Sequence, residues 1–152
     1  VKYRPTGGFC AFYLADPGPA GGFGVFDSDR RAKPALRALT DACRPVIVVG
    51  EPLPTSVGVG KVYEIAIHVV SDLHESLRDG VVSATIHHAD GTTDVHRWGG
   101  DLEADSVARI ALLSVPALQP GALTVELALT AVADDAENGE ITAHSSVKTT
   151  VS

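Results

Sequence analysis

The segment GALTVELALTA, residues 121–131, carries the most regular hydrophobic pattern of the chain. Its apolar side chains stand at every second position, at Leu123, Val125, Leu127 and Leu129, and Thr124, Glu126 and Thr130 lie between them. Successive side chains of a strand point to opposite faces. This alternation therefore predicts a β-strand with one face in a core and the other in solvent.

Similar segments follow one another from Pro45 onward, separated by turn-rich stretches at the spacing typical of a β-sandwich. The candidate strands are residues 45–53, 61–72, 80–88, 92–98, 106–115, 121–132 and 140–151. In the second of these, Tyr63, Ile65, Ile67 and Val69 are predicted to face the core, and Glu64 and His68 to face solvent. Residues 45–152 are therefore predicted to form an immunoglobulin-like antiparallel β-sandwich.

The chain before Pro45 has a different character. The continuous apolar run Phe9–Leu14 predicts a strand that is buried on both faces, and a loop rich in glycine and proline follows it. The stretch FDSDRRAKPALRALTDACRPV, residues 26–46, then predicts an amphipathic helix with Pro34 in its first turn. Its apolar stripe comprises Ala32, Ala35, Leu36, Leu39, Ala42 and Cys43. Residues 1–44 thus resemble half of a βα unit, which cannot form a domain alone.

Composition narrows the function classes. A net charge of −7 argues against a nucleic-acid partner, because phosphate binding needs clustered lysine and arginine. No apolar run approaches the ~20 residues that span a bilayer, so no membrane partner is predicted. The start at Val1 without a leader pattern indicates a trimmed or mature fragment, and the sequence does not indicate a compartment. Cys10 and Cys43 are predicted to be buried free thiols.

One hairpin gathers polar side chains, in SATIHHADGTTDVHRW, residues 83–98. A two-residue turn at Asp90-Gly91 would place one group of residues on an outer face: His87, Asp94, His96 and Trp98. Val82, Ala84, Ile86 and Val95 would then face the core. Such an outer face could be plain solvated surface, could contact a ligand or another domain, with Trp98 stacking on a sugar, or could bind a metal ion. The other histidines considered, His68, His74 and His144, are isolated and predicted to be exposed.

No complete active site can be assembled from the residues. A serine nucleophile motif G-x-S-x-G, a metal-type cysteine pair and a calcium loop are all absent from the sequence. The carboxylates Asp16, Asp27 and Asp29 of the N-terminal part do not make an acid and nucleophile pair. We therefore predict no catalytic residue, no metal ligand and no cofactor.

The N-terminal third nevertheless resembles a known family. The stretch YRPTGGFCAFYLADPGPAGGFGVFDSDRRAKPALRAL, residues 3–39, is similar to the end of the catalytic barrel of family 2 glycoside hydrolases, especially the β-mannosidase-like branch. Motif positions of that family are matched at Phe12, Asp16, Pro19, Phe23 and Asp27, with Phe12 and Phe23 in place of tryptophan. The resemblance covers about residues 2–46. Two motif positions depart from the family, with Ala15 in place of asparagine and Gly18 in place of a second tryptophan.

The resemblance implies a fold and a role for each part. Phe9–Ala15 would be the last strand of a (β/α)8 barrel, the helix would follow it, and an immunoglobulin-like domain would complete the chain. Phe12 and Asp16 would then line the sugar site, whereas the two catalytic glutamates of a retaining enzyme would lie outside this chain. The expected partner is the remainder of the barrel, with carbohydrate bound through the parent enzyme, and the exposed helix stripe could also mediate self-association. The alternative is a free-standing β-sandwich module that binds carbohydrate or protein.

Overall fold

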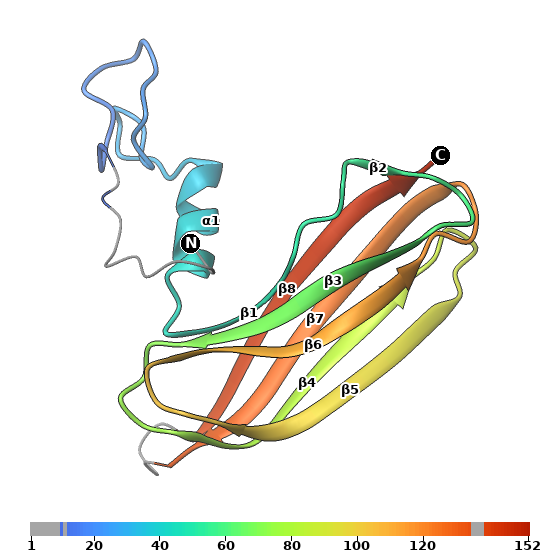
Figure 1. Cartoon of the computed structure of the whole chain (residues 1–152). Helices are drawn as coiled ribbons and strands as arrows, with labels where there is room; N and C mark the ends of the chain where they lie inside the picture. Colours follow the sequence, from blue (N-terminus) through green and yellow to red (C-terminus); the bar gives the residue numbers. More distant parts are fainter. Residues whose placement is uncertain (1–9, 11, 135–138) are drawn as a thin grey trace. The chain divides into compact units, whose positions relative to one another are not determined.

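The computed structural model describes residue 10, residues 12–134 and residues 139–152. The chain divides into two compact units, Val1–Arg44 and Pro45–Ser152, and each is considered by itself. The described residues of the first unit contain one helix, α1 (Pro34–Ala42). Those of the second form eight strands in two sheets, labelled in Figure 1.

Helix α1 begins where the proline predicted it. Pro34 occupies the first turn, where its missing N–H costs no hydrogen bond, and the helix ends as the Cys43 N–H donates to the Leu39 carbonyl. None of its residues is buried, although its apolar stripe is present. The two cysteines, Cys10 and Cys43, were predicted to be buried but are exposed. For Cys43 the reason is that it ends α1, a helix without any buried residue.

The strand predicted over Phe9–Leu14 is not found among its described residues. Phe9 and residue 11 lie outside the described part, and residues 10 and 12–14 form no strand. Ala15 makes a single parallel bridge with Phe26, which makes an antiparallel bridge with Ala32. A strand needs neighbours that satisfy its backbone N–H and C=O groups, and residues 12–44 supply none for this segment beyond these bridges.

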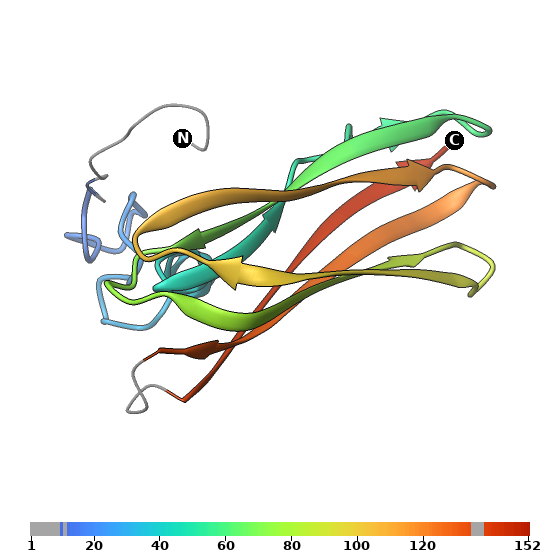
Figure 2. The same ribbon diagram turned by 60° about the horizontal axis from the view of Figure 1, so that its bottom comes forward.

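The strands of the second unit are β1 (Val46–Gly50), β2 (Ser56–Val57), β3 (Val62–Ser71), β4 (Leu77–His87), β5 (Thr93–Leu102), β6 (Ser106–Pro116), β7 (Gly121–Ala133) and β8 (Glu140–Val151). One sheet has the order β1-β3-β6 and the other the order β2-β8-β7-β4-β5. All pairs are antiparallel except the short pair of β2 with β8. Figure 2 shows the two sheets as separate layers. The predicted mainly β sandwich is confirmed, and β2 is an addition to the seven expected strands.

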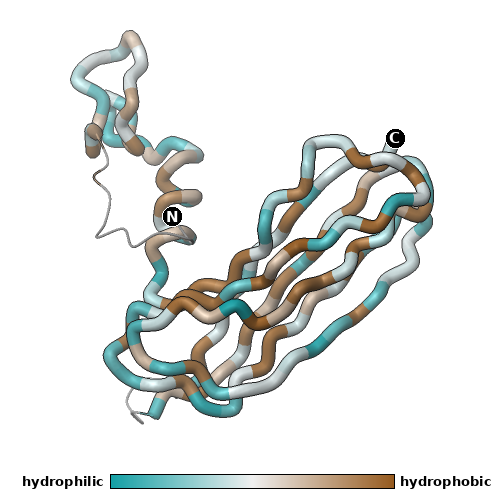
Figure 3. The backbone as a smooth tube through the Cα atoms, in the orientation of Figure 1, coloured by the Kyte–Doolittle hydropathy of each residue, from teal (hydrophilic) through white to brown (hydrophobic). Residues whose placement is uncertain are grey.

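The core lies between the two sheets and is built by alternating side chains. On β7 the four apolar residues of the opening segment are at most 2% exposed. Figure 3 shows this alternation of hydrophobic and hydrophilic positions along the strands. On β3, Ile65, Ile67 and Val69 are buried as expected.

His68 departs from the expected pattern of β3. It is buried, at 4% exposed, where solvent exposure was predicted. The reason is its place in the middle strand of the three-stranded sheet, between Val49 of β1 and Arg109 of β6. His74 and His144 are exposed, as predicted.

Candidate functional site

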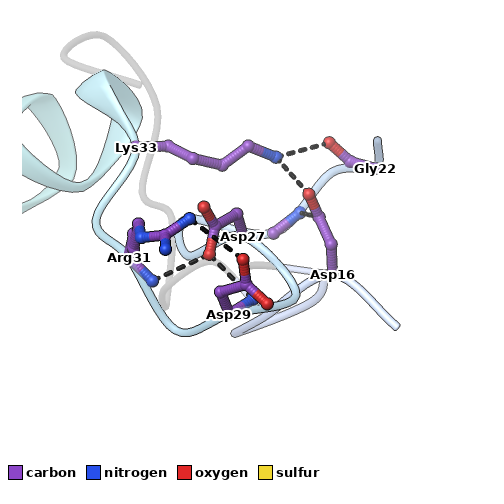
Figure 4. A network of polar contacts seen from close by, with 7 residues as sticks. Asp16, Gly22, Asp27, Asp29, Arg31 and Lys33 are labelled. Carbon is purple, nitrogen blue, oxygen red and sulfur yellow. Dashed lines mark hydrogen bonds and ion pairs between the residues drawn. The ribbon is translucent and has the colours of Figure 1, made fainter. Parts of the chain in front are cut away.

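In the first unit, Asp16 lies at the centre of a polar network (Figure 4). One carboxylate oxygen accepts a hydrogen bond from the Gly24 amide at 2.8 Å, and the other pairs with the Lys33 ammonium at 2.6 Å. Lys33 also donates to the Gly22 carbonyl at 2.9 Å. Through these contacts a carboxylate at the end of the apolar run fixes the glycine-rich loop to the residue that precedes helix α1.

The glycines of this loop leave room for the Asp16 carboxylate. A Cβ added to Gly22 or Gly24 would lie 2.7 Å from Asp16 Oδ1, which is closer than side chains can approach. The hydrogen bond from Lys33 is the largest cause that lowers the pKa of Asp16, and the hydrogen bond from Gly24 lowers it further. Asp16 is therefore held as a carboxylate inside the loop.

Asp27 organises the neighbouring turn, also drawn in Figure 4. Its Oδ1 accepts hydrogen bonds from the amides of Asp29 at 2.9 Å and Arg31 at 2.8 Å. Arg31 in turn pairs with the Asp29 carboxylate at 2.9 Å. Such bonds from an aspartate to amides a few residues ahead are typical of turns, and they bring Lys33 to the start of the helix.

The two residues predicted to bind sugar occupy different environments. The Phe12 ring is 70% exposed and lies against the Tyr13 ring, with centroids 4.1 Å apart. Asp16 is 7% exposed and its two oxygens are occupied by Gly24 and Lys33. The contacts of Asp16 therefore stabilise the loop, whereas the Phe12 ring is exposed to solvent. Sugar binding by either residue remains a prediction.

In the second unit, the polar hairpin has a register that differs from the predicted one. Thr93 lies opposite His87, and the His88 amide donates to the Thr92 carbonyl, which leaves a three-residue loop, 89–91. Gly91 has a φ of +86°, the arrangement of a type I turn closed by a left-handed residue. The Asp90 carboxyl supports the turn by accepting hydrogen bonds from the Thr92 hydroxyl and the Thr92 amide. These bonds, together with one from Gln119, lower the pKa of Asp90 to about 2.

This one-residue difference overturns the predicted assignment of faces. Asp94, His96 and Trp98 lie opposite Ile86, Ala84 and Val82, and so share the inner face with core residues. Val95, predicted to face the core, lies opposite Thr85 and is 50% exposed. His87 remains on the outer face, with its Nε2 3.2 Å from the Glu126 carboxylate.

The sequence prediction did not single out His88, which contacts the hairpin carboxylate. Its ring is buried and its Nε2 lies 2.9 Å from Asp94 Oδ2. The signal in the sequence was the pair His87-His88 itself, since one of two adjacent strand residues must face inward. Within residues 10, 12–134 and 139–152, no three histidine, cysteine or acidic side chains are grouped so that they could hold a metal ion. In the same part of the chain no helix is long and apolar enough to cross a membrane.

Comparisons with known proteins identify the fold only. No protein-family model matches the sequence, and no curated protein matches it. The second unit is similar to the CARDB domain of the PF1109 protein from Pyrococcus furiosus in complex with di-metal ions, with 20% identity and a TM-score of 0.53 over 70% of this chain and 87% of that chain. The solution structure of the same domain gives a TM-score of 0.50, with 20% identity, over 70% of this chain and 94% of that chain.

A further similar structure is the alkylpurine DNA glycosylase AlkC of Pseudomonas fluorescens bound to DNA. It has 16% identity and a TM-score of 0.50, over 76% of this chain and 32% of that chain. At such identities the likeness defines the class of fold, a β-sandwich domain. It carries no activity from those proteins to this chain.

Proposed function

We propose that this chain is the C-terminal part of a β-mannosidase-like glycoside hydrolase. Residues 1–44 are the last βα unit of its catalytic barrel, and residues 45–152 are an immunoglobulin-like domain that follows the barrel. The parent enzyme hydrolyses O-glycosidic bonds with retention, using glutamates that lie outside this chain. The chain itself has a structural, accessory role and does not hydrolyse glycosides alone.

The observation that carries the proposal is the incompleteness of the first unit. Helix α1 has an apolar stripe but no buried residue, and Phe12, Leu14 and Phe23 are 70%, 69% and 84% exposed. Large apolar side chains exposed in this number within one small unit favour a surface that another protein segment covers. The remainder of a barrel is the partner that a terminal βα unit requires, because parallel strands and their helices bury both faces only in the complete fold.

The motif aspartates give a second line of support. Asp16 and Asp27, which match the two aspartate positions of the family motif, are the residues whose carboxylates hold the loop before α1 through backbone amides. Active sites of such barrels lie at the carboxyl ends of the strands and are built from the loops that follow them. A loop fixed by Asp16 would therefore hold Phe12 as an aromatic wall of the parent's sugar site.

The test compares two proteins, the isolated chain of residues 1–152 and the full-length parent enzyme. We expect the coding sequence upstream of Val1 to specify further βα units with two glutamates at strand ends. The complete product should hydrolyse an aryl β-mannoside, and the Phe12→Ala variant should raise KM more than a Phe12→Tyr variant. The isolated chain should show no turnover. A stop codon immediately upstream, or enzyme-like hydrolysis by the isolated chain, would reject the proposal.

Apart from the barrel, the same stripe of α1 is proposed to pair with a second copy of the chain. Sedimentation equilibrium should then show a dimer that Leu36→Lys dissociates. Arg37→Glu, on the opposite side of the helix, should leave the dimer intact. A monomer at all accessible concentrations would contradict this pairing.

A further inference from the structure

The open side of the sandwich, where β5 and β6 end their respective sheets, contains a cavity of about 350 Å³. Its walls come from both sheets, and Trp98, Val82, Leu129, Arg109 and Ile110 are among its lining residues. Val82 and Leu129 are core residues that are at most 3% exposed, so they form an apolar floor. The cavity thus reaches from solvent to the core between the layers.

Gly100 leaves this cavity open, whereas a Cβ on Gly80 would meet the Gly100 carbonyl oxygen at 2.5 Å. Gly80 and Gly100 face each other across β4 and β5, on the same inner face as Trp98. A Cβ added to Gly100 would meet no atom within 4 Å, so the space beside it is empty. Any larger residue at this position would project into the cavity, and the strand conformation there does not require glycine.

The chemistry of the walls suits a ligand with one apolar face and polar edges. The Trp98 and His96 rings lie nearly parallel, at 10°, with centroids 6.0 Å apart, and form an aromatic wall along β5. Asp101 is already engaged, with one oxygen accepting from the Asp79 amide and the other from Arg78. Arg109 of β6 is exposed, but it lies opposite His68, next to the inward-facing Val69, so its side chain belongs to the outer face of the three-stranded sheet. The polar groups that the inner face offers to a ligand are therefore the His96 imidazole and the Asp94 carboxylate.

A second hollow, of about 430 Å³, continues along the same side of the sandwich. It is lined by Asp94, His96 and Val95 of β5, and by Ser114 and Pro116 of β6 together with Val62. His96 stands between the two hollows, because it neighbours Trp98 on the inner face and lines the second hollow itself. We name the two hollows together the β5–β6 groove.

We propose that the β5–β6 groove binds a carbohydrate chain, with one pyranose ring on Trp98 and its hydroxyls near His96 and Asp94. Binding sites for small ligands are concave, mostly apolar and aromatic, with a few polar groups that orient the ligand. A sugar ring offers an apolar face of C–H groups to an indole and hydroxyl acceptors and donors at its rim. This inference concerns the sandwich alone and does not rest on the proposed role of residues 1–44.

The experiment measures the intrinsic tryptophan fluorescence of the full chain. Trp98 is the only tryptophan, so intrinsic fluorescence reports on this groove directly. We expect a saturable change in Trp98 emission, and protection from acrylamide quenching, on titration with at least one of three hexasaccharides: β-1,4-mannohexaose, cellohexaose or chitohexaose. Calorimetry with the same sugars should give the matching affinity.

A matched pair of valine variants separates the two faces of this sheet. Gly100→Val fills the groove and should abolish binding of the responding hexasaccharide. Ser83→Val places the same side chain on the outer face, opposite Arg97, and should bind like the original chain. His96→Ala should weaken binding by about 5-fold or more, the loss of one hydrogen bond. Arg97→Ala, which removes a side chain from the outer face of β5, should have no effect.

Circular dichroism and urea unfolding establish that each variant is folded before its binding is measured. Equal loss of binding in Ser83→Val and Gly100→Val, or unchanged binding in folded Gly100→Val, would overturn the proposal. So would the absence of a saturable response to all three sugars. A response to adenosine or to an extended peptide in place of the sugars would overturn the assigned class of ligand.

Discussion

Asp16 illustrates how a single carboxylate can define the local structure of an incomplete unit. Its two oxygens satisfy a backbone amide and a lysine ammonium that are far apart in sequence. In the sequence alone Asp16 was a candidate for sugar contact, on the basis of a family resemblance. Its hydrogen bonds give it a structural role in the loop. That role depends on Gly22 and Gly24, because a Cβ at either position would collide with the carboxylate, and a hydrophobicity pattern does not reveal this requirement.

The Asp16 network should be sensitive to acid. Because Lys33 and Gly24 lower its pKa in the folded unit, Asp16 stabilises the loop at pH values above the ordinary aspartate pKa of about 3.9. That contribution is lost as the pH falls below this value and through the lowered pKa of the folded state. Carbon-detected NMR titration should give a lower midpoint for Asp16 in the original chain than in Lys33→Gln. Equal midpoints in the two proteins would show that Lys33 does not hold the carboxylate.

At the scale of elements, the β4–β5 hairpin determines which side chains the sandwich shows to solvent. A two-residue turn and a three-residue turn differ by one residue, yet they place Asp94, His96 and Trp98 on opposite faces of the sheet. The three-residue form requires a left-handed residue, which Gly91 supplies at a φ of +86°. The accessible surface of β5 therefore depends on the conformation of one glycine.

Replacing that glycine should destabilise the hairpin. Gly91→Ala forces a Cβ into the left-handed region and should lower the free energy of unfolding by about 1 kcal/mol. Gly91→Asn should recover most of this loss, because asparagine tolerates positive φ better than alanine. Urea unfolding of the three proteins measures both effects. An alanine variant as stable as the original chain would indicate that the loop adopts another turn.

The elements also show which parts of the fold the sequence could predict. The strands with regular alternation, such as Leu123 to Leu129 in β7, were predicted because their inner and outer faces differ in polarity. The register of β4 with β5 was missed because Asp90-Gly91 fits two turn types, and the polar inner face at the open edge does not resemble a core. The strand Ser56–Val57 was missed because two residues carry no period.

On the scale of the whole molecule, the two units differ in how far they are complete. The core cluster of the sandwich is formed by residues between Val46 and Val151. The N-terminal unit has apolar side chains in contact with solvent, while the sandwich has a continuous buried interior. Sequence reasoning could place the boundary near Arg44-Pro45 because the hydrophobic period changes there, but it could not supply the first unit with its missing neighbours.

Removal of the first unit should therefore leave the sandwich intact. We expect residues 45–152, produced alone, to unfold in urea at the same midpoint as the full chain, and with a single cooperative transition. The same fragment should survive limited proteolysis of the full chain. A lower midpoint for the fragment would mean that residues 1–44 contribute to the stability of the sandwich.

The pairing of β2 with β8 has a consequence for the time course of folding. Ser56 and Val57 pair with Thr150 and Val151, and Thr55 and Pro54 also bond to β8 at their backbone carbonyls. Strand partners so distant in sequence must wait for the closure of a long loop, and domains dominated by such pairings fold in milliseconds to seconds. During synthesis, the five-stranded sheet can acquire its edge only after residue 151 has left the ribosome. Until then β7 presents an unpaired edge, so the nascent sandwich is most exposed to aggregation before β8 has emerged.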